Sequence, residues 1–388
     1  MRIVVDCRYV RVGRHDGFSR FSAGVVTALA ERHEVTLLVS DPRQLDSLPD
    51  QPHLLVSAPT SVREPLVARQ VNRLRPDVVW SPMQTMGSIG RRYPLVLTLH
   101  DLIYYTNRTP PPEFAWPIRA LWRLYHLAWW PQRALLNRAD AIVTVSRTTR
   151  DEIRRHRLTR RPVTVVYNAA DPVASVPTRR VPERRDLVYM GSFMPYKNVA
   201  TLARALPLLD GYRLHLMSRV SEAERASLTA LAPAGSLVFH DGASDDEYRE
   251  TLLGSTAVVT ASRAEGFGIP LVEGMALGTP AVVSDIPIFR EIGGDAALYF
   301  DPASPASIAA ALRRLEGEWE ARSAAALDQA ARFSWRASAD VLLRLLADVA
   351  ASGAHGQRGP RRRSQNRPGG AARPGQDGSA TSRSRTFW

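Results

Sequence analysis

The chain contains a single lysine, Lys197, although lysine and arginine together account for 51 of its 388 residues. Arginine and lysine replace each other more readily on a surface than at a chemical site, so we attribute the arginine bias to genome composition. The one lysine that remains has then been kept either by chance or because the chemistry at this position requires an ammonium group. The stretch MGSFMPYKNVA, from Met190 to Ala200, is therefore the first segment to consider.

Cysteine and long apolar runs are also scarce. The only cysteine, Cys7, excludes an intramolecular disulfide and, because it lies in the first apolar run, predicts a buried thiol in a reducing compartment. No stretch approaches the roughly 18 apolar residues of a transmembrane helix, and the start of the chain is too short for a signal peptide. We expect a cytoplasmic protein, either free or peripheral at the inner face of the membrane.

The formal charge of +13 would suit a nucleic-acid-binding protein, but its distribution argues against that class. Residues 358–385 hold eight arginines and one aspartate, which is about half of the excess charge. This tail is rich in glycine, proline and serine and cannot support a packed core, so residues 353–388 are predicted to be disordered. Its role would be solubility or contact with anionic lipid.

Short apolar runs alternate with amphipathic stretches along nearly the whole chain, a pattern typical of βα units and parallel sheets. A proline-rich, charged segment at 173–185 is the predicted linker between domains at 1–172 and 186–332, and a helix that Ser334 can cap follows at 333–352. The candidate strands are RIVVD, EVTLLV, DVVW, PLVLTL, AIVTV and VTVVY, then DLVYM, YRLHLM, SLVFH, TAVVTA, PAVVS and AALYF.

Ligands of such sheets bind beyond the carboxyl ends of the strands, so two facing sheets predict a cleft between the domains. Strand DLVYM runs into Gly191-Ser192, and Lys197 then opens a helical stretch. Backbone N–H groups and the helix dipole favour an anion at that point, so the lysine could hold a phosphate. The alternative is an ordinary solvated lysine in a first helical turn.

A second candidate segment, SRAEGFGIPLVEGMALGTPAVVSD, follows strand TAVVTA. Its Gly266-Phe267-Gly268 turn allows close backbone approach, and Pro270 suits a first helical turn because no N–H donor is needed there. Glu265 and Glu273 straddle this helix start, where one carboxylate could bind a sugar and the other a ribose. Taken singly, each could be an ordinary surface acid.

These motifs resemble the retaining nucleotide-sugar glycosyltransferases of the GT-B fold in family four. The signature of that family is a glutamate, seven intervening residues and a second glutamate, written around E-G-F-G and followed by G-T-P, and the chain reads EGFGIPLVEGMALGTP. The start of the chain, DGFSRFSAGVVTAL, is similar to mannosyltransferase-like members. The resemblance spans roughly residues 1–350 and implies two facing Rossmann-like domains with an interdomain cleft, the first on the acceptor side and the second binding the donor.

The resemblance implies three catalytic residues. Lys197 would neutralise the diphosphate of the leaving group, Glu265 would contact the transferred sugar, and His100 would lie close to that sugar. Without the resemblance, His100 would be interpreted as a strand-end residue with a backbone partner.

The resemblance also implies the donor-binding set. Glu273 would hold the ribose, and Gly17 would border the diphosphate. Many relatives carry an arginine where this chain has Ser192, and Arg263 is the candidate replacement. The remaining members are Gly191, Lys197, Phe267, Gly268 and Ile269.

The implied reaction is transfer of a hexose, with GDP-mannose as the favoured donor, to a hydroxyl of a glycan or lipid-linked acceptor in polysaccharide or glycoconjugate synthesis. Anomeric configuration would be retained, and neither a metal nor another cofactor is expected because lysine and helix dipoles supply the positive field. A GT-B-fold sugar-nucleotide epimerase and a basic nucleic-acid-binding protein are the alternative hypotheses.

One further segment, Trp116 to Asp140, mixes four tryptophans with arginines at partly helical spacing, interrupted by Pro131. We expect its aromatic stripe to pack on the first sheet, because buried stripes are commoner than membrane-binding ones. The alternative is an interfacial helix with its rings at headgroup depth.

Overall fold

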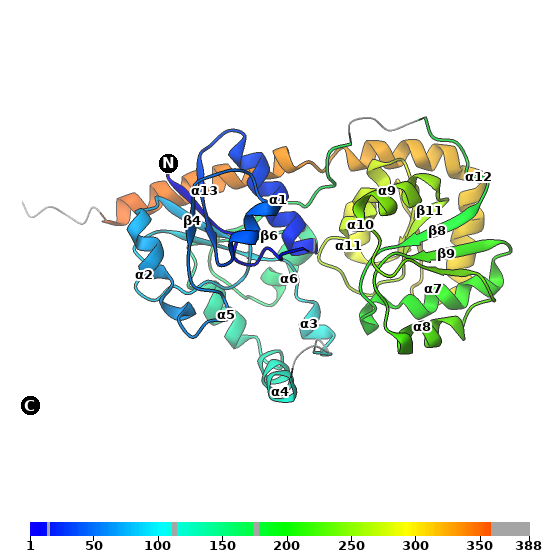
Figure 1. Cartoon of the computed structure of the whole chain (residues 1–388), viewed down its shortest axis with the longest axis horizontal. Coiled ribbons are helices and arrows are strands. Elements are labelled where there is room, and N and C mark those ends of the chain that lie inside the picture. Colours follow the sequence, from blue (N-terminus) through cyan, green and yellow to red (C-terminus); the bar gives the residue numbers. More distant parts are fainter. Residues whose placement is uncertain (14–15, 111–114, 174–177, 358–388) are drawn as a thin grey trace, which may run out of the picture.

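The computed structural model describes residues 1–13, 16–110, 115–173 and 178–357. They form two α/β domains that lie side by side, each built around a parallel sheet (Figure 1). The predicted fold class is therefore confirmed. Within the described ranges, no helix combines the length and the apolar content needed to cross a membrane.

The sheet of the first domain has the strand order β3-β2-β1-β4-β5-β6-β7. All six strands that the sequence predicts in this half are present. The seventh, β3, escaped prediction because it is a three-residue edge strand with no buried side chain. The strands are β1 (Ile3–Asp6), β2 (Val35–Val39), β3 (His53–Leu55), β4 (Val78–Ser81), β5 (Leu95–Leu99), β6 (Ala141–Thr144) and β7 (Val163–Val165).

The longest helix between these strands, α1, is capped by Asp16, whose carboxylate accepts a 2.9 Å hydrogen bond from the backbone of Ser19. Cys7, just after β1, is fully buried as predicted. The helices of this domain are α1 (Gly17–Ala30), α2 (Ala68–Val71), α3 (Ile103–Thr106), α4 (Trp116–Tyr125), α5 (Trp130–Leu136) and α6 (Arg147–Arg155), with 3-10 turns at Pro42–Ser47, Glu64–Leu66 and Asn72–Leu74.

The sheet of the second domain has the order β10-β9-β8-β11-β12-β13, and its strands are the six that the sequence predicts. They are β8 (Arg185–Tyr189), β9 (Tyr212–Leu216), β10 (Leu237–Phe239), β11 (Ala257–Thr260), β12 (Ala281–Ser284) and β13 (Leu298–Phe300). The helices are α7 (Val199–Ala205), α8 (Glu222–Thr229), α9 (Asp245–Gly254), α10 (Ile269–Ala276), α11 (Pro287–Gly293) and α12 (Pro305–Ala330), with 3-10 turns at Pro195–Lys197 and Leu206–Leu208.

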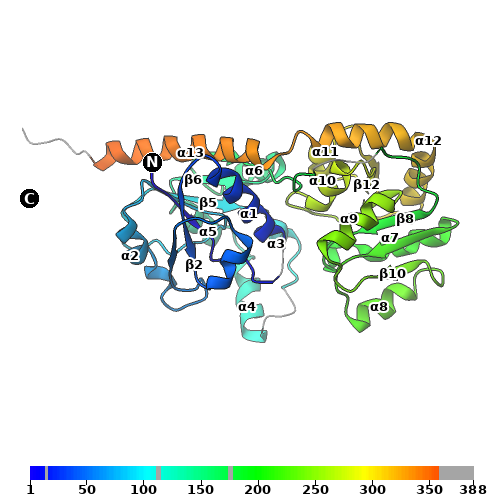
Figure 2. The same cartoon turned by 45° about the horizontal axis from the view of Figure 1, so that its top comes forward.

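The last helix, α13 (Trp335–Gln357), leaves the second domain and packs back along the first (Figure 2). Ser334 caps it as predicted, accepting a 3.2 Å hydrogen bond from the backbone of Ala337. The helix continues to Gln357, past the predicted boundary at 352, so the first residues assigned to a disordered tail are helical. The rest of that tail, 358–388, lies outside the described residues.

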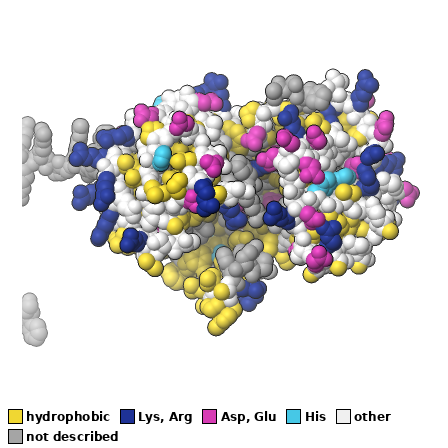
Figure 3. Space-filling model, in the orientation of Figure 1, with side chains coloured by type: hydrophobic (Ala, Val, Ile, Leu, Met, Phe, Trp, Pro, Cys, Tyr) yellow, Lys and Arg dark blue, Asp and Glu magenta, His cyan; other side chains and the backbone are white. Residues whose placement is uncertain are grey.

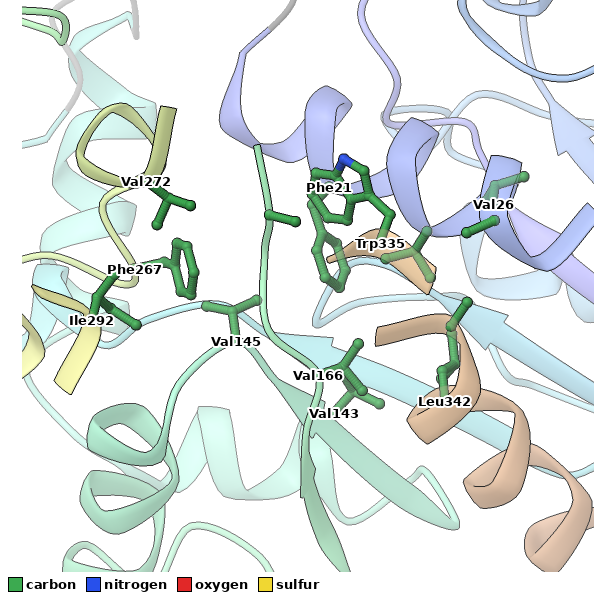
Figure 4. Close-up of a cluster of buried hydrophobic side chains, with 14 of the residues drawn as sticks. Phe21, Val26, Val143, Val145, Val166, Phe267, Val272, Ile292, Trp335 and Leu342 are labelled. Carbon is green, nitrogen blue, oxygen red and sulfur yellow. The ribbon is translucent and has the colours of Figure 1, made fainter. Parts of the chain in front are cut away.

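Side chains from both domains share one hydrophobic cluster (Figure 4). Phe267 of the second domain and Phe21 of the first belong to it, together with Trp335 of α13. A polar contact adds to this junction: the carboxylate of Glu291 in α11 accepts hydrogen bonds of 2.6 and 2.7 Å from the first two backbone amides of α6, where a helix favours an anion. The domains therefore meet through both apolar and polar contacts.

The expectation that the Trp116–Asp140 segment packs on the first sheet is wrong for α4. This helix has no buried side chain, and Figure 1 shows it projecting from the domain. The following helix, α5, has Pro131 in its first turn and does pack inward through buried Gln132 and Leu136. The physical reason is that α4 packs against α3 instead of the sheet. Trp122 of α4 contacts Tyr104 of α3, and His126, which follows α4, contacts Tyr105.

Candidate functional site

Both sheets reverse their strand order at one point, between β1 and β4 in the first domain and between β8 and β11 in the second. Ligands of open α/β sheets bind at such points, beyond the carboxyl ends of the strands. The segment after β1 leads to Gly17, the segment after β8 to Lys197, and the segment after β11 to Glu265. His100 follows β5, the neighbour of β4, and the surface is hollowed between the two domains (Figure 3).

Lys197 and Glu265 form an ion pair, with 2.6 Å between the lysine Nζ and one carboxylate oxygen. The hydroxyl of Ser262 donates a 2.7 Å hydrogen bond to the same oxygen. The side chains of the pair are only 17% and 13% exposed, so little water screens their interaction. The two residues that the sequence singles out for an anion and a sugar are thus direct neighbours.

The local backbone around Lys197 differs from the predicted helix start. Lys197 ends a 3-10 turn, and Asn198 adopts the left-handed conformation, with φ of 55°, before α7 begins. The Asn198 side-chain amide donates hydrogen bonds to the carbonyls of Ala261 and Pro302, at 3.1 and 2.7 Å. Asparagine tolerates this conformation better than most residues, and its side chain ties the Lys197 loop to the end of β11.

The loop from Glu265 to Ile269 approaches the first domain closely because it contains glycine. A Cβ atom on Gly266 would lie 3.0 Å from the carbonyl oxygen of His100 and 3.1 Å from the Cβ of Asp101. Gly268 has a φ of 94° and precedes α10, whose start has no side-chain cap. Pro270 lies in the first turn as predicted. The backbone amides of this uncapped start are suited to bind an anion.

His100 is held on three sides. One ring nitrogen, Nε2, lies 2.7 Å from the carbonyl oxygen of Pro82, and the rings of Phe18 and Phe21 approach edge-on at 4.7 and 5.0 Å between centroids. Burial lowers the pKa of His100 to about 4, so the ring is neutral at pH 7. Because a carbonyl can only accept, Nε2 carries the proton and Nδ1 is left as an acceptor for a hydroxyl group.

Gly17, at the start of α1, faces the second domain. A Cβ atom there would lie 3.6 Å from the side chain of Ile269, the first residue of α10. The structure therefore brings together Gly17, His100, Lys197 and the Glu265–Ile269 loop, which the sequence predicts as parts of one site.

Glu273 lies one helical turn inside α10 and contacts a residue that the sequence analysis missed. Arg20 of α1 donates a 2.9 Å hydrogen bond to the Glu273 carboxylate and also pairs with Asp245 and, at 3.6 Å, with Asp171. Burial raises the pKa of Glu273, and the charge of Arg20 opposes this shift. These residues line a cavity of about 200 Å³. Arg20 stands three positions after Gly17 on the same helix, and this spacing was the available signal.

The remaining predicted donor-binding residues flank the Lys197 loop. The Gly191 amide donates to the hydroxyl of Ser218 at 3.2 Å, and the Ser192 carbonyl accepts from the hydroxyl of Tyr189 at 2.6 Å. Arg263 is exposed, with its guanidinium 3.4 Å from the Asn198 side-chain oxygen. Its backbone position therefore lies near the Lys197 loop, but its exposed guanidinium does not occupy a buried position like that of Lys197.

No group of three or more His, Cys, Asp or Glu side chains in the described ranges is arranged to hold a metal ion. The cleft contains the ion pair of Lys197 with Glu265 and the cluster of Arg20 with Glu273, Asp171 and Asp245, and the start of α10 adds its helix dipole.

Comparison with known proteins matches both halves of the chain. Residues 15–173 match the family model described as Glycosyltransferase Family 4, and residues 175–333 match Glycosyl transferases group 1. The O-antigen chain mannosyltransferase RfbU of Salmonella typhimurium is 24% identical over 77% of this chain and 87% of its own. The phosphatidyl-myo-inositol mannosyltransferase of Mycobacterium leprae is 32% identical over 44% of this chain and about half (48%) of its own.

Solved structures share the fold. The crystal structure of HepE from Anabaena in complex with UDP and glucose superposes with a TM-score of 0.66 at 17% identity and covers 90% of this chain and all of that one. At this level of identity the likeness concerns the two-domain architecture alone.

Proposed function

The chain belongs to glycosyltransferase family 4, and from this premise we propose that it moves a hexose, favouring mannose, from a nucleotide-diphosphate sugar to a hydroxyl of a glycan or lipid-linked acceptor. The observation that carries the proposal is the Lys197–Glu265 pair, which lies beside the uncapped start of α10. A ligand with a phosphate and a sugar next to each other could contact both members of this pair at once.

The chemistry follows from the charges at this point. The bond between the anomeric carbon and the diphosphate oxygen breaks, and negative charge develops on the departing diphosphate. The ammonium of Lys197 and the amides of Phe267, Gly268 and Ile269 would stabilise that charge, which is the largest contribution such a site can make. Glu265 would accept hydrogen bonds from the sugar, and Nδ1 of His100 would accept another.

Retention of configuration is part of this proposal. The acceptor oxygen would bond to the anomeric carbon on the face that the diphosphate leaves, and the acceptor proton would pass to the departing phosphate oxygen. No side chain forms a covalent bond in this scheme. Metal independence is proposed on the same grounds, because the positive field comes from Lys197 and from α10.

The names of the relatives support the proposed sugar and acceptor. Two of them carry mannosyltransferase in their names, which supports mannose as the transferred hexose, and we keep GDP-mannose as the favoured donor. Their names point to O-antigen chains and phosphatidyl-inositol as acceptors. HepE binds UDP, so a UDP-sugar is the competing donor. We propose a cytoplasmic enzyme, peripheral at the membrane, that extends a cell-surface glycan or glycolipid.

The test is a thermal-shift screen against GDP, UDP and dTDP, followed by analysis of the transfer product made from the donor that binds. A ligand that binds only the folded state raises the melting temperature, by an amount equivalent to about 2.7 kcal/mol at a hundredfold excess over Kd. We expect GDP to be selective and the product to keep the anomeric configuration of the donor. Absence of a shift with every nucleotide would refute the donor site.

A further inference from the structure

The projecting helix α4, the loop after it and the start of α5 expose a set of large apolar side chains. The exposed fraction reaches 81% for Trp116 and 69% for Trp130. Figure 3 shows hydrophobic side chains gathered over this projection. We call this set the α4 surface; its members are Trp116, Ile118, Leu121, Leu124, Leu127 and Trp130.

The charges on the same segment have one sign. Between Trp116 and Arg138 the sequence has four arginines, Arg119, Arg123, Arg133 and Arg138, and no acidic residue. Arg123 is exposed on α4 itself, Arg133 is exposed on α5, and Arg138 is exposed in the turn after α5. The α4 surface therefore combines an apolar face with a rim of cations.

Aromatic contacts hold one side of α4 against the first domain. The other side of the helix is therefore exposed although the helix itself is packed in place. The ring of Trp122 lies 4.0 Å from that of His126 and 4.9 Å from that of Tyr104 in α3, measured between centroids. Tyr105 stacks on Trp129 at 3.9 Å. This aromatic cluster fixes the helix on one side and leaves Leu121 and Leu124 on the outside.

We infer that the α4 surface docks the protein on an anionic membrane. Interfacial helices bury apolar and aromatic side chains at headgroup depth, while their arginines contact anionic lipid, and the α4 surface has both components. A helix that projects from the domain can also contact the flat surface of a bilayer more easily than a groove could. A second copy of the chain is a poorer occupant, because a symmetric pairing of this surface would oppose arginine to arginine.

The position of the α4 surface connects it to the proposed reaction, and this step depends on the function proposed above. Tyr104, which supports Trp122, belongs to the helix that directly follows His100 and Asp101. A docked α4 would therefore hold the mouth of the cleft near the membrane. An acceptor with a lipid anchor would then reach the site without leaving the bilayer.

The experiment is co-sedimentation of the full chain with vesicles. Vesicles of phosphatidylcholine with phosphatidylglycerol are compared with vesicles of phosphatidylcholine alone, at low and high salt. The variants are Leu121→Ser/Leu124→Ser for the apolar face and Arg119→Gln/Arg123→Gln for the cations. The matched control is Leu55→Ser/Leu66→Ser, which changes two exposed leucines elsewhere on the same domain.

We expect the wild type and the control to bind anionic vesicles, each test variant to bind at least tenfold more weakly, and salt to weaken binding. Equal binding by the wild type and the leucine variant, or no binding by the wild type, would overturn the proposal. A wild-type dimer that the leucine variant abolishes would assign the surface to a second copy instead. The nucleotide thermal shift is measured on every variant and should stay unchanged, which separates failure of docking from failure of the donor site.

Discussion

Arg20 of α1 donates a 2.9 Å hydrogen bond to Glu273 of α10, across the junction of the two domains. The side chains are 17% and 13% exposed, and two further carboxylates, Asp171 and Asp245, surround the same guanidinium. One arginine of the first domain therefore balances carboxylates of the second domain and of Asp171, which lies just before the linker. Helix α1 therefore contacts Glu273, the residue to which the sequence resemblance assigns the ribose of the donor.

Replacing Arg20 by alanine should destabilise the protein and weaken donor binding. The substitution leaves the buried carboxylate of Glu273 near those of Asp171 and Asp245 without a cation to balance them. Loss of one partner of a buried ion pair costs about 3–5 kcal/mol. Chemical denaturation and the KM for the donor measure the two effects. Arg43→Ala is the control, because Arg43 pairs with Asp41 on the surface, where water screens the pair, and its loss should leave the free energy of unfolding nearly unchanged. Equal stability of both variants would contradict the assignment.

Lys197→Ala and Glu265→Ala should each lower kcat by about a hundredfold or more while the protein still folds. The melting temperature should also fall, because each change breaks an ion pair whose side chains are mostly buried. Removal of one group that stabilises the transition-state charge has an effect of about 10²–10³ on turnover. Arg263→Ala is the comparison, because Arg263 lies beside Lys197 but is exposed, and we expect a smaller effect. Steady-state kinetics and thermal unfolding decide; wild-type turnover in both Lys197 and Glu265 variants would remove the proposed site.

The parts of the site that could be predicted from sequence are those in which a local backbone requirement determines the residue type. Glycine in the Glu265–Ile269 loop and proline in the first turn of α10 have this character. Lys197 was predictable for another reason, because it is the only lysine of the chain and matches the family motif. The strands were predictable because buried parallel strands are continuous apolar runs.

The parts that the sequence did not predict depend on tertiary packing. The contact of Arg20 with Glu273 joins residues 253 positions apart. The spacing of Arg20 from Gly17 places it on the right helix but does not identify its partner. For α4, an apolar stripe has the same pattern whether it packs on a sheet or faces outward. The two possibilities are distinguished by the contacts of Trp122 with Tyr104 and His126, which hold α4 away from the sheet and which the sequence pattern does not reveal.

His100 should make the protein less stable as the pH falls. Burial lowers its pKa to about 4 in the folded state, below the usual value of 6.5. Between these values the unfolded chain binds a proton that the folded chain does not, so stability present above pH 6.5 is lost on acidification, by less than about 1.4 kcal/mol per pH unit. We expect His100→Asn to reduce this slope in denaturation curves measured from pH 7 to 4.5. An unchanged slope would show that the ring is not held neutral.

A chelator should leave transfer nearly intact, because the proposed positive field comes from Lys197 and α10. The measurement is the initial rate after dialysis against EDTA, with and without added Mg²⁺. Complete loss of activity that Mg²⁺ restores would refute the metal-free mechanism.

The close approach of Gly266 to the first domain gives the last prediction. An alanine Cβ there would lie 3.0 Å from the carbonyl oxygen of His100, a backbone atom that cannot rotate away, so Gly266→Ala should push the Glu265 loop and the His100 loop apart. Small displacements of positioned groups have large effects on rate, and we expect kcat/KM to fall about tenfold or more. Gly254→Ala is the matched control, because its Cβ would meet no atom within 4 Å. If the two variants had equal kcat/KM and equal melting temperatures, the contact between these loops would have no part in assembling the site.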